Sequence, residues 1–120
     1  MSSGYNESGL GEGTQDIHRA LASFQEELEA IDYYQQRMDK TSDPELRALL
    51  EHNRDEEIAH ATMLFEWLRR TMPGFDAQAK QFIFSKGSIT AQEEGSSDDA
   101  PDAAASDRDG AGLGIGNLTS

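Results

Sequence analysis

The stretch MDKTSDPELRALL at residues 38–50 ends one helical pattern and starts another, and it decides how the chain folds. Asp43 is a good residue to cap the start of a helix, and Pro44 suits the first helical position. Ser42 and Glu45 offer an alternative capping box. Because the connection is so short, the two helices are expected to run antiparallel as a hairpin.

Apolar residues recur at spacings of three and four on both sides of this connection, which predicts amphipathic helices. The first helix is expected over roughly residues 16–39, and its apolar residues are Ile17, Ala20, Leu21, Phe24, Leu28, Ile31, Tyr34 and Met38. The second should run from Pro44 to just before Pro73, and its apolar residues include Leu46, Leu49, Leu50, Ala61, Leu64, Trp67 and Leu68. A shorter third helix is expected over about residues 75–84.

The predicted fold is therefore all-α, an antiparallel two-helix hairpin with a short third helix. Two helices alone leave an apolar stripe exposed on each, so the hairpin is expected to associate with a second copy of itself. Two hairpins together make a four-helix bundle. Homo-oligomerisation is thus predicted before any function is considered.

The composition excludes several classes of protein. The 120 residues include 23 acidic and 10 basic side chains, which give a net charge of −13. This excess argues against duplex DNA and against anionic membrane surfaces, since both need Lys and Arg. The chain has no cysteine, which excludes disulfides, thiolate zinc sites and Fe–S clusters. No bilayer-spanning apolar run and no secretory signal are visible, so a reducing cytosol is the expected compartment.

Composition also divides the chain into segments. Residues 1–14 are rich in Gly and Ser and are expected to be disordered, and residues 15–87 should form the helical domain. Residues 88–112 form an acidic linker with too few apolar groups to offset the entropy of ordering. At the end, in residues 113–120, aliphatic side chains return between glycines, in the run Leu113, Gly114, Ile115, Gly116, Asn117 and Leu118. This run fits either an extended peptide that docks on a partner or an inert Gly-rich end.

Polar residues interrupt the apolar stripes at one level of the hairpin. At about 100° per residue, Asn53, Glu57 and His60 lie in the middle of the second stripe, and Glu27 lies in the first. A buried carboxylate is costly unless it is paired or binds a metal. The arginines that could pair with these groups fall outside the inward arcs, namely Arg19, Arg37, Arg47 and Arg54.

These residues have the composition of half a di-iron site. Such bundles take one Glu from each of two helices and a Glu-x-x-His pair from each of two others. Here Glu27 is the single carboxylate and Glu57-x-x-His60 is the pair, so a two-fold dimer would supply four carboxylates and two imidazoles. Oxygen-rich ligation with two histidines suits iron or manganese. The alternative is that a chance Glu-x-x-His contains a hydrogen-bonded histidine of the helix interface.

Further acidic residues lie around this level. Glu26 and Glu29 flank Glu27 on its outer side and form either a rim that gathers cations or a solvated face. His52 and Glu56 are four residues apart, and they either chelate weakly or pair structurally.

Three stretches together resemble the encapsulated ferritins, which are cargo of encapsulin shells. They are FQEELEAIDYY at 24–34, HNRDEEIAHATMLFEWLRR at 52–70 and LGIGNL at 113–118. The resemblance implies a half-ferritin whose dimers complete a ferritin-like four-helix bundle and assemble into an annular decamer. It also implies a di-iron ferroxidase centre at the dimer interface, with oxygen or peroxide as the oxidant. The last stretch would direct the chain into the lumen of an encapsulin nanocompartment, in a bacterial or archaeal cytoplasm, where the shell stores iron.

The resemblance assigns roles to individual residues. Glu27 corresponds to the iron ligand of the first helix, Glu57 to the bridging carboxylate and His60 to the imidazole ligand. Tyr34 corresponds to a tyrosine beside the centre.

The peripheral sites depart from the family pattern. Glu26 and Glu29 correspond to a carboxylate pair through which metal enters, but Tyr33 stands where relatives can have Trp. Ala59 stands where relatives can have a carboxylate in an outer metal site, near His52 and Glu56. Calcium or other divalent cations are candidates for these outer carboxylates.

Two other functions remain open from the sequence. A di-iron peroxidase on a related bundle would carry similar residues and would also be encapsulin cargo. A non-catalytic helical-hairpin cargo or adaptor protein would need Glu27, Glu57 and His60 to be neutralised without metal.

Overall fold

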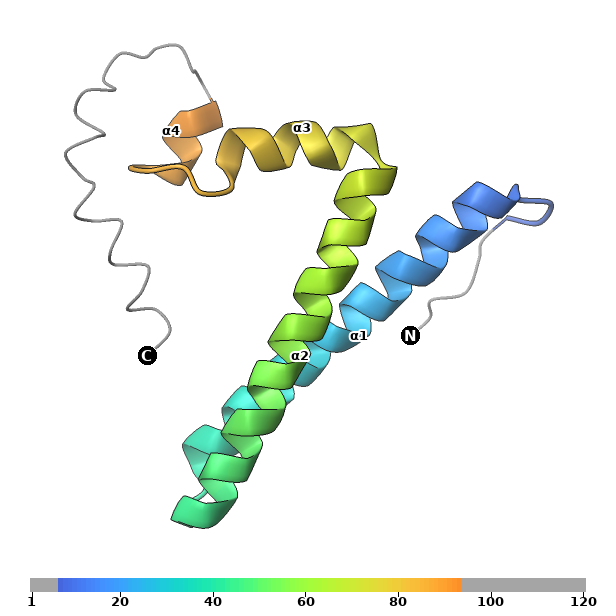
Figure 1. Cartoon of the computed structure of the whole chain (residues 1–120). Helices are drawn as coiled ribbons and strands as arrows, with labels where there is room; N and C mark the ends of the chain where they lie inside the picture. The colour runs from blue at the N-terminus through green and yellow to red at the C-terminus, as the bar shows by residue number, and fades with distance from the viewer. Residues whose placement is uncertain (1–6, 94–120) are drawn as a thin grey trace. The chain divides into compact units, whose positions relative to one another are not determined.

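The computed structural model describes residues 7–93, and these residues form helices without strands (Figure 1). The helices are α1 (Glu12–Lys40), α2 (Pro44–Thr71), α3 (Pro73–Phe82) and α4 (Ile89–Glu93). The predicted all-α class, with two long helices and a short third, is confirmed. None of the helices described is long and apolar enough to cross a membrane.

The start and end of α2 follow the sequence signals. Asp43 is the N-cap, and its Oδ1 accepts a hydrogen bond from the backbone N–H of Glu45 at 3.0 Å. Pro44 is the first helical residue, where its missing N–H costs no helical hydrogen bond. The helix ends at Thr71, and the N–H of Met72 donates to the carbonyl of Leu68 at 2.8 Å.

The start of α1 differs from the prediction. The helix begins at Glu12 rather than near Asp16, and Gly11 caps it without a side-chain hydrogen bond. Gln15 secures this first turn, because its backbone N–H donates to the carbonyl of Gly11 and its Nε2 donates to the carbonyl of Leu10. Three residues of the segment expected to be disordered, 12–14, are therefore helical.

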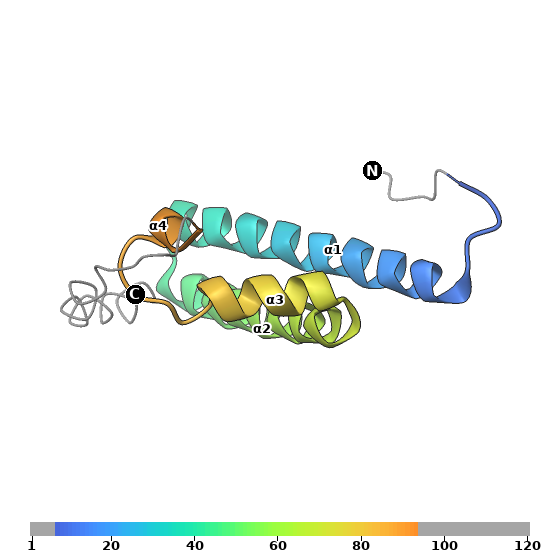
Figure 2. The same cartoon turned by 90° about the horizontal axis from the view of Figure 1, so that it is seen from above.

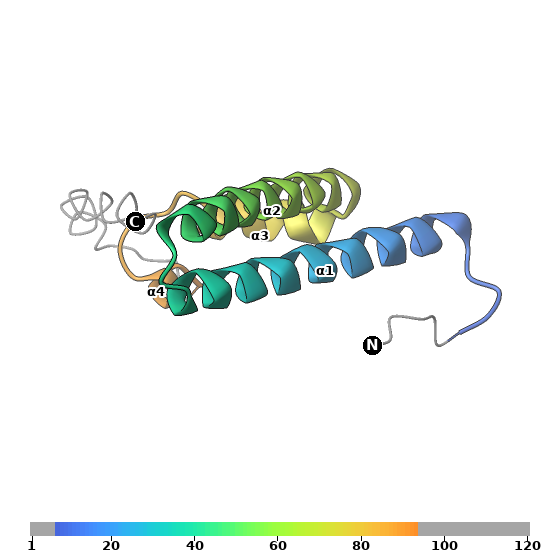
Figure 3. The same cartoon turned by 90° about the horizontal axis from the view of Figure 1, so that it is seen from below.

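The two long helices form an antiparallel hairpin within one compact unit, which ends at Met72. Views from opposite sides show α1 and α2 side by side along most of α2 (Figures 2 and 3). The rings of Phe24 and Phe65 meet across the helices, with centroids 6.3 Å apart. Ala20 and Ala61 are buried, and such small side chains allow two helices to approach closely.

A polar contact also joins the helices. Arg54 Nη1 donates to Gln35 Oε1 at 2.7 Å, and the Arg54 side chain is only 16% exposed. Arg54 was expected outside the inward arc, and its long side chain nevertheless reaches the other helix. Its guanidinium extends toward α1, where it pairs with Gln35 rather than with the inward glutamates, and it also contacts Asp55 on its own helix.

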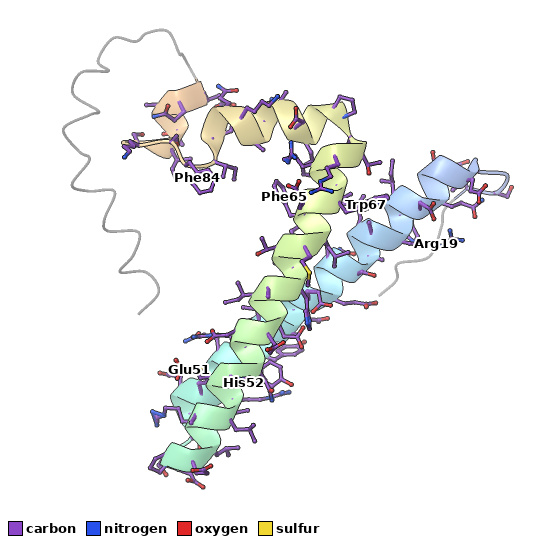
Figure 4. All side chains as sticks on the ribbon, in the orientation of Figure 1. Arg19, Glu51, His52, Phe65, Trp67 and Phe84 are labelled. Carbon is purple, nitrogen blue, oxygen red and sulfur yellow. The ribbon has the colours of Figure 1, made fainter. Side chains whose placement is uncertain are left out.

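The hairpin leaves much of its apolar surface exposed. Trp67 on α2, for example, carries an exposed side chain (Figure 4). The exposed large apolar residues of the two long helices are Leu21, Leu28, Tyr33, Leu46, Leu49, Ile58, Met63 and Trp67. A hairpin with this surface is consistent with association with a second copy, which stays a prediction.

The second compact unit begins at Pro73 and contains α3 and α4. Gln81 Nε2 on α3 donates to the carbonyl of Gln92 on α4 at 2.7 Å. Beyond α3, Phe84 has a left-handed backbone, with φ of 66°, and its side chain projects from the ribbon (Figure 4). The short helix α4 lies in the segment expected to be a linker.

Candidate metal centre

Three side chains meet between the two long helices. Glu27 comes from α1, while Glu57 and His60 come from α2. His60 Nδ1 lies 3.6 Å from Glu27 Oε1 and 3.4 Å from Glu57 Oε1. One ligand atom from each residue lies within 4.8 Å of the others, and residues 7–93 contain no second group of three His, Cys, Asp or Glu residues with this property. The structure therefore brings together the three residues that the sequence analysis selected.

Helix geometry explains why these residues meet. Residues three apart on a helix lie on one face, so the side chains of Glu57 and His60 project in nearly the same direction. The short connection from Thr41 to Asp43 sets the antiparallel register that places Glu27 opposite them.

The electrostatics of this cluster favour an added cation. The pKa of Glu27 is raised above its ordinary value, first by a hydrogen bond to Glu57, then by partial burial and by repulsion from the Glu57 charge. His60 opposes this shift and lowers the pKa of Glu27. Two carboxylates this close resist being ionised together, so a cation between them would relieve their repulsion.

The spacing of the ligand atoms also suits a metal ion. Distances of 3.4 and 3.6 Å are too long for good hydrogen bonds. Oxygen and nitrogen ligands at about 2.0–2.2 Å from one ion lie roughly 3–4 Å from each other. Two carboxylates and one imidazole form a set that suits iron or manganese.

One chain supplies only part of a coordination sphere. The side chains are 25% exposed for Glu27, 23% for Glu57 and 43% for His60. The cluster is therefore open on one side, where further ligands can approach.

Tyr34 lies seven residues after Glu27, two helical turns along the same face of α1. Its side chain is half-buried, and the guanidinium carbon of Arg37 lies 5.6 Å from its ring centroid. The same carbon lies 5.7 Å from the ring centroid of Tyr33. Arg37 therefore contacts both tyrosines by cation–π interaction, and this restrains the ring of Tyr34.

Two of the peripheral residues predicted to take up metal are in contact with each other. The Tyr33 hydroxyl donates to Glu29 Oε2 at 2.9 Å, and this hydrogen bond raises the pKa of Tyr33. Glu26 is exposed and belongs to no three-residue ligand group within residues 7–93. The structure thus links Tyr33 with Glu29, and the role of Glu26 stays a prediction.

Comparison with known protein families identifies the family of this chain. A sequence model of the EncFtn-like family matches residues 4–86, which is more than half of the chain. The chain belongs to the EncFtn-like family.

Three relatives of this EncFtn-like chain are named as ferritin-like proteins or as encapsulin cargo. The "Encapsulated ferritin-like protein" of Rhodospirillum rubrum is 49% identical over 115 residues, which cover 91% of this chain and 81% of that protein. The "Ferritin-like protein" of Thermotoga maritima is 46% identical over 104 residues, which cover 87% of this chain and 86% of that protein. The "Encapsulin nanocompartment cargo protein EncC" of Myxococcus xanthus is 37% identical over 57 residues, 48% of this chain and 44% of that protein.

A solved structure shares the fold of the EncFtn-like chain. The crystal structure of a Nitrosomonas europaea protein superposes with a TM-score of 0.69 at 50% sequence identity. The match covers 72% of this chain and 97% of that one.

A fourth residue of this EncFtn-like chain, Glu56, lies beside the cluster. Glu56 Oε1 lies 3.8 Å from His60 Nε2, on the side of the imidazole away from the other carboxylates. The spacing of four residues predicts a pairing of Glu56 with His52, and that contact exists at 3.8 Å. The contact with His60 was missed, although the same spacing of four residues would have revealed it. The predicted docking peptide at 113–118 lies outside the described residues.

Proposed function

We propose that this protein is a ferroxidase that oxidises Fe(II) to Fe(III) at a di-iron centre shared between two copies of the chain. The convergence of Glu27, Glu57 and His60 from two helices is the observation that supports it most. The raised pKa of Glu27 supports it further. Among the causes of this shift no Lys or Arg stabilises the ionised carboxylate, so a bound cation would.

Two copies are needed to complete the centre. One hairpin offers two carboxylates and one imidazole, which is half of the ligand set of a di-iron bundle. A two-fold axis beside His60 would bring a second identical set, because a symmetric interface repeats the same residues on both sides. The exposed apolar side chains of α2 would be covered by the same contact. We propose that such dimers assemble further into an annular decamer.

Each residue then has a defined task on the iron substrate. Glu27 and Glu57 would neutralise the charge of Fe(II) and its greater charge after oxidation, with Glu57 as the carboxylate shared by the two ions. The His60 of each copy would contribute one nitrogen to one iron. Two ferrous ions lose one electron each, and dioxygen takes up these two electrons and two protons to become hydrogen peroxide. Peroxide is the alternative acceptor. Tyr34, restrained by Arg37, lines the centre.

Surface carboxylates would supply this centre with metal. Glu29, held by the Tyr33 hydroxyl, and the exposed Glu26 are proposed as the place where cations collect before they reach Glu27. Calcium or another divalent cation would compete with iron at such outer carboxylates, because they are oxygen ligands without imidazole.

We also propose that the protein works inside an encapsulin shell in the cytoplasm of a bacterium or archaeon. The names of the Rhodospirillum rubrum and Myxococcus xanthus relatives support this location. Residues 113–118 are proposed to bind the inner surface of the shell, which would store and detoxify the oxidised iron. Deletion of residues 113–120 should abolish loading into co-expressed shells and leave iron oxidation intact. Normal loading of the truncated chain would refute this role.

Anaerobic titration of the purified oligomer with Fe(II) tests the centre itself. About one tightly bound iron per chain, or two per dimer, is expected for a site shared between two hairpins. Admission of oxygen should then oxidise the bound iron rapidly. Absence of tight binding would refute the ferroxidase and favour a structural cargo or adaptor. Peroxide turnover that exceeds iron oxidation would favour a di-iron peroxidase instead.

A further inference from the structure

The imidazole of His60 lies between carboxylates on both sides. Its Nδ1 faces Glu27 and Glu57, at 3.6 and 3.4 Å. Its Nε2 faces Glu56 Oε1 at 3.8 Å. The two nitrogens of this ring therefore have separate surroundings, one within the candidate metal centre and one outside it.

A metal ligand needs a lone pair on the nitrogen that faces the metal. A neutral imidazole has one N–H and one lone pair, so a proton on Nε2 leaves Nδ1 able to bind. Ligating histidines generally donate their other N–H to a carboxylate, a carbonyl or water, which fixes the ring and its tautomer. Glu56 is the carboxylate that stands at Nε2 of His60.

We propose that Glu56 is a positioning residue for His60. Its negatively charged oxygen, 3.8 Å from Nε2, favours a proton on that nitrogen and so leaves the Nδ1 lone pair directed toward Glu27 and Glu57. This inference rests on the proposed function where it concerns iron, but the orientation of the ring is a property of the metal-free protein. Glu56 thereby acts through His60 and does not itself contact the iron.

The placement of Glu56 argues against its being a ligand of the centre. It is absent from the group of three residues whose ligand atoms converge, and that is the one such group within the described part of the chain. Its other oxygen, Oε2, lies 3.8 Å from His52 Nε2, one turn earlier on α2. Glu51 and His52 project from this same level of the helix (Figure 4). The two oxygens of Glu56 therefore face two histidines, His52 one turn before it and His60 one turn after it on α2.

The test uses the full chain and four variants. Glu56→Ala removes the acceptor, while Glu56→Gln keeps an acceptor oxygen of similar reach. His52→Ala removes the other histidine beside Glu56. Glu51→Gln removes a neighbouring exposed glutamate charge on the same helix, which makes it the matched charge control.

The first measurement is ¹⁵N NMR of the histidine ring nitrogens in metal-free protein. Glu56 should increase the fraction of neutral His60 that carries its proton on Nε2, and this fraction should be the same in the unmodified chain, in Glu56→Gln and in both controls. In Glu56→Ala the fraction should fall, because the two carboxylates at Nδ1 then attract the proton without competition. An unchanged fraction in Glu56→Ala would overturn the proposal.

The second measurement is the anaerobic affinity for Fe(II). Loss of a partner of this kind weakens metal binding by about 10–100-fold, and this loss is expected in Glu56→Ala. Glu56→Gln should recover most of the affinity, and His52→Ala and Glu51→Gln should bind like the unmodified chain. Unchanged affinity in Glu56→Ala would overturn the positioning role. So would an equal loss in His52→Ala, since Glu56 and His52 would then form a metal site of their own.

The two proposals fail in different ways. If the unmodified chain binds no Fe(II), the ferroxidase proposal fails, and the NMR measurement still decides whether Glu56 orients His60. If the unmodified chain binds and oxidises iron while Glu56→Ala does the same with equal affinity, only the positioning proposal fails.

Discussion

Glu66 and Glu27 lie on the two long helices of one hairpin, yet their surroundings are opposite. Glu66, near the end of α2, has Arg69 Nη2 and Arg70 Nε each 2.7 Å from its Oε2, and these arginines lower its pKa to about 2. Glu27 faces Glu57 and His60, and its pKa is raised. The charge of Glu66 is balanced within the chain, whereas that of Glu27 is not.

This difference separates a structural carboxylate from one suited to bind a cation. The arginines beside Glu66 lie in the last turn of α2, where positive charge also complements the helix dipole. Among the side chains that shift the pKa of Glu27, only His60 lowers it. The unbalanced charge is therefore concentrated where the chain also offers an imidazole.

The largest expected effect concerns iron oxidation. Loss of a residue that only supports a metal ligand weakens a metal site by about 10–100-fold. Glu57→Ala and His60→Ala each remove a ligand itself, so each should reduce the rate of iron oxidation by more than this. Glu66→Gln should oxidise iron at the unmodified rate. Stopped-flow absorbance of ferric product measures this, with circular dichroism to confirm that helicity is retained. Full activity in His60→Ala would show that the residues around Glu27 are no more important for iron oxidation than those around Glu66.

A second effect concerns stabilisation by metal. Fe(II) at about 100 times its Kd should raise the free energy of unfolding by about 2.7 kcal/mol, because only the folded protein binds it. Glu66→Gln should show the same gain and Glu57→Ala should show none. Anaerobic thermal unfolding with and without Fe(II) provides the measurement. An equal gain in Glu57→Ala would place the bound metal elsewhere.

The pH dependence of the metal-free protein should differ in sign between the two glutamates. The folded pKa of Glu27 exceeds its ordinary value of 4.5, so its contribution to stability falls as the pH rises from 4.5 through the raised pKa. The contribution of Glu66 is present above 4.5 and is lost as the pH falls toward about 2. Urea unfolding across this range should show the first slope disappear in Glu27→Gln and the second in Glu66→Gln. If the free energy of unfolding had the same pH dependence in both variants, the opposite signs expected for Glu27 and Glu66 would be contradicted.

The smallest effect concerns Glu66 at neutral pH. Glu66→Gln should lower the Tm only slightly, because exposed ion pairs are well screened by solvent and salt. The difference should shrink further in 1 M salt, where the Debye length is about 3 Å. A large, salt-independent loss of Tm would show that Glu66 has a role beyond its two arginines.

The candidate centre was largely predictable from the sequence because helix geometry fixes it. The spacing of three residues in Glu57-x-x-His60 determines a shared face, and Glu27 stands out as a charge within an apolar stripe. The turn at Asp43 and Pro44 carries its own capping signal, which set the register of the hairpin. These features are local, so no knowledge of distant contacts was needed.

Other features depend on side-chain reach, which a helical projection does not contain. Arg54 was assigned outside the inward arc, but its long side chain extends to Gln35 on the other helix. Glu56 was paired only with His52, although it also meets the far nitrogen of His60. The first turn of α1 was missed because Gly11 caps it without a side-chain signal.

The open side of the cluster links catalysis to protein concentration. With His60 43% exposed and only half of the proposed ligands on one chain, a separated hairpin would hold iron weakly. In the proposed two-copy centre, the formation of each site is second order in protein, so activity per chain falls on dilution. Confinement of the chain in a small volume would then favour the assembled, active form without any further signal.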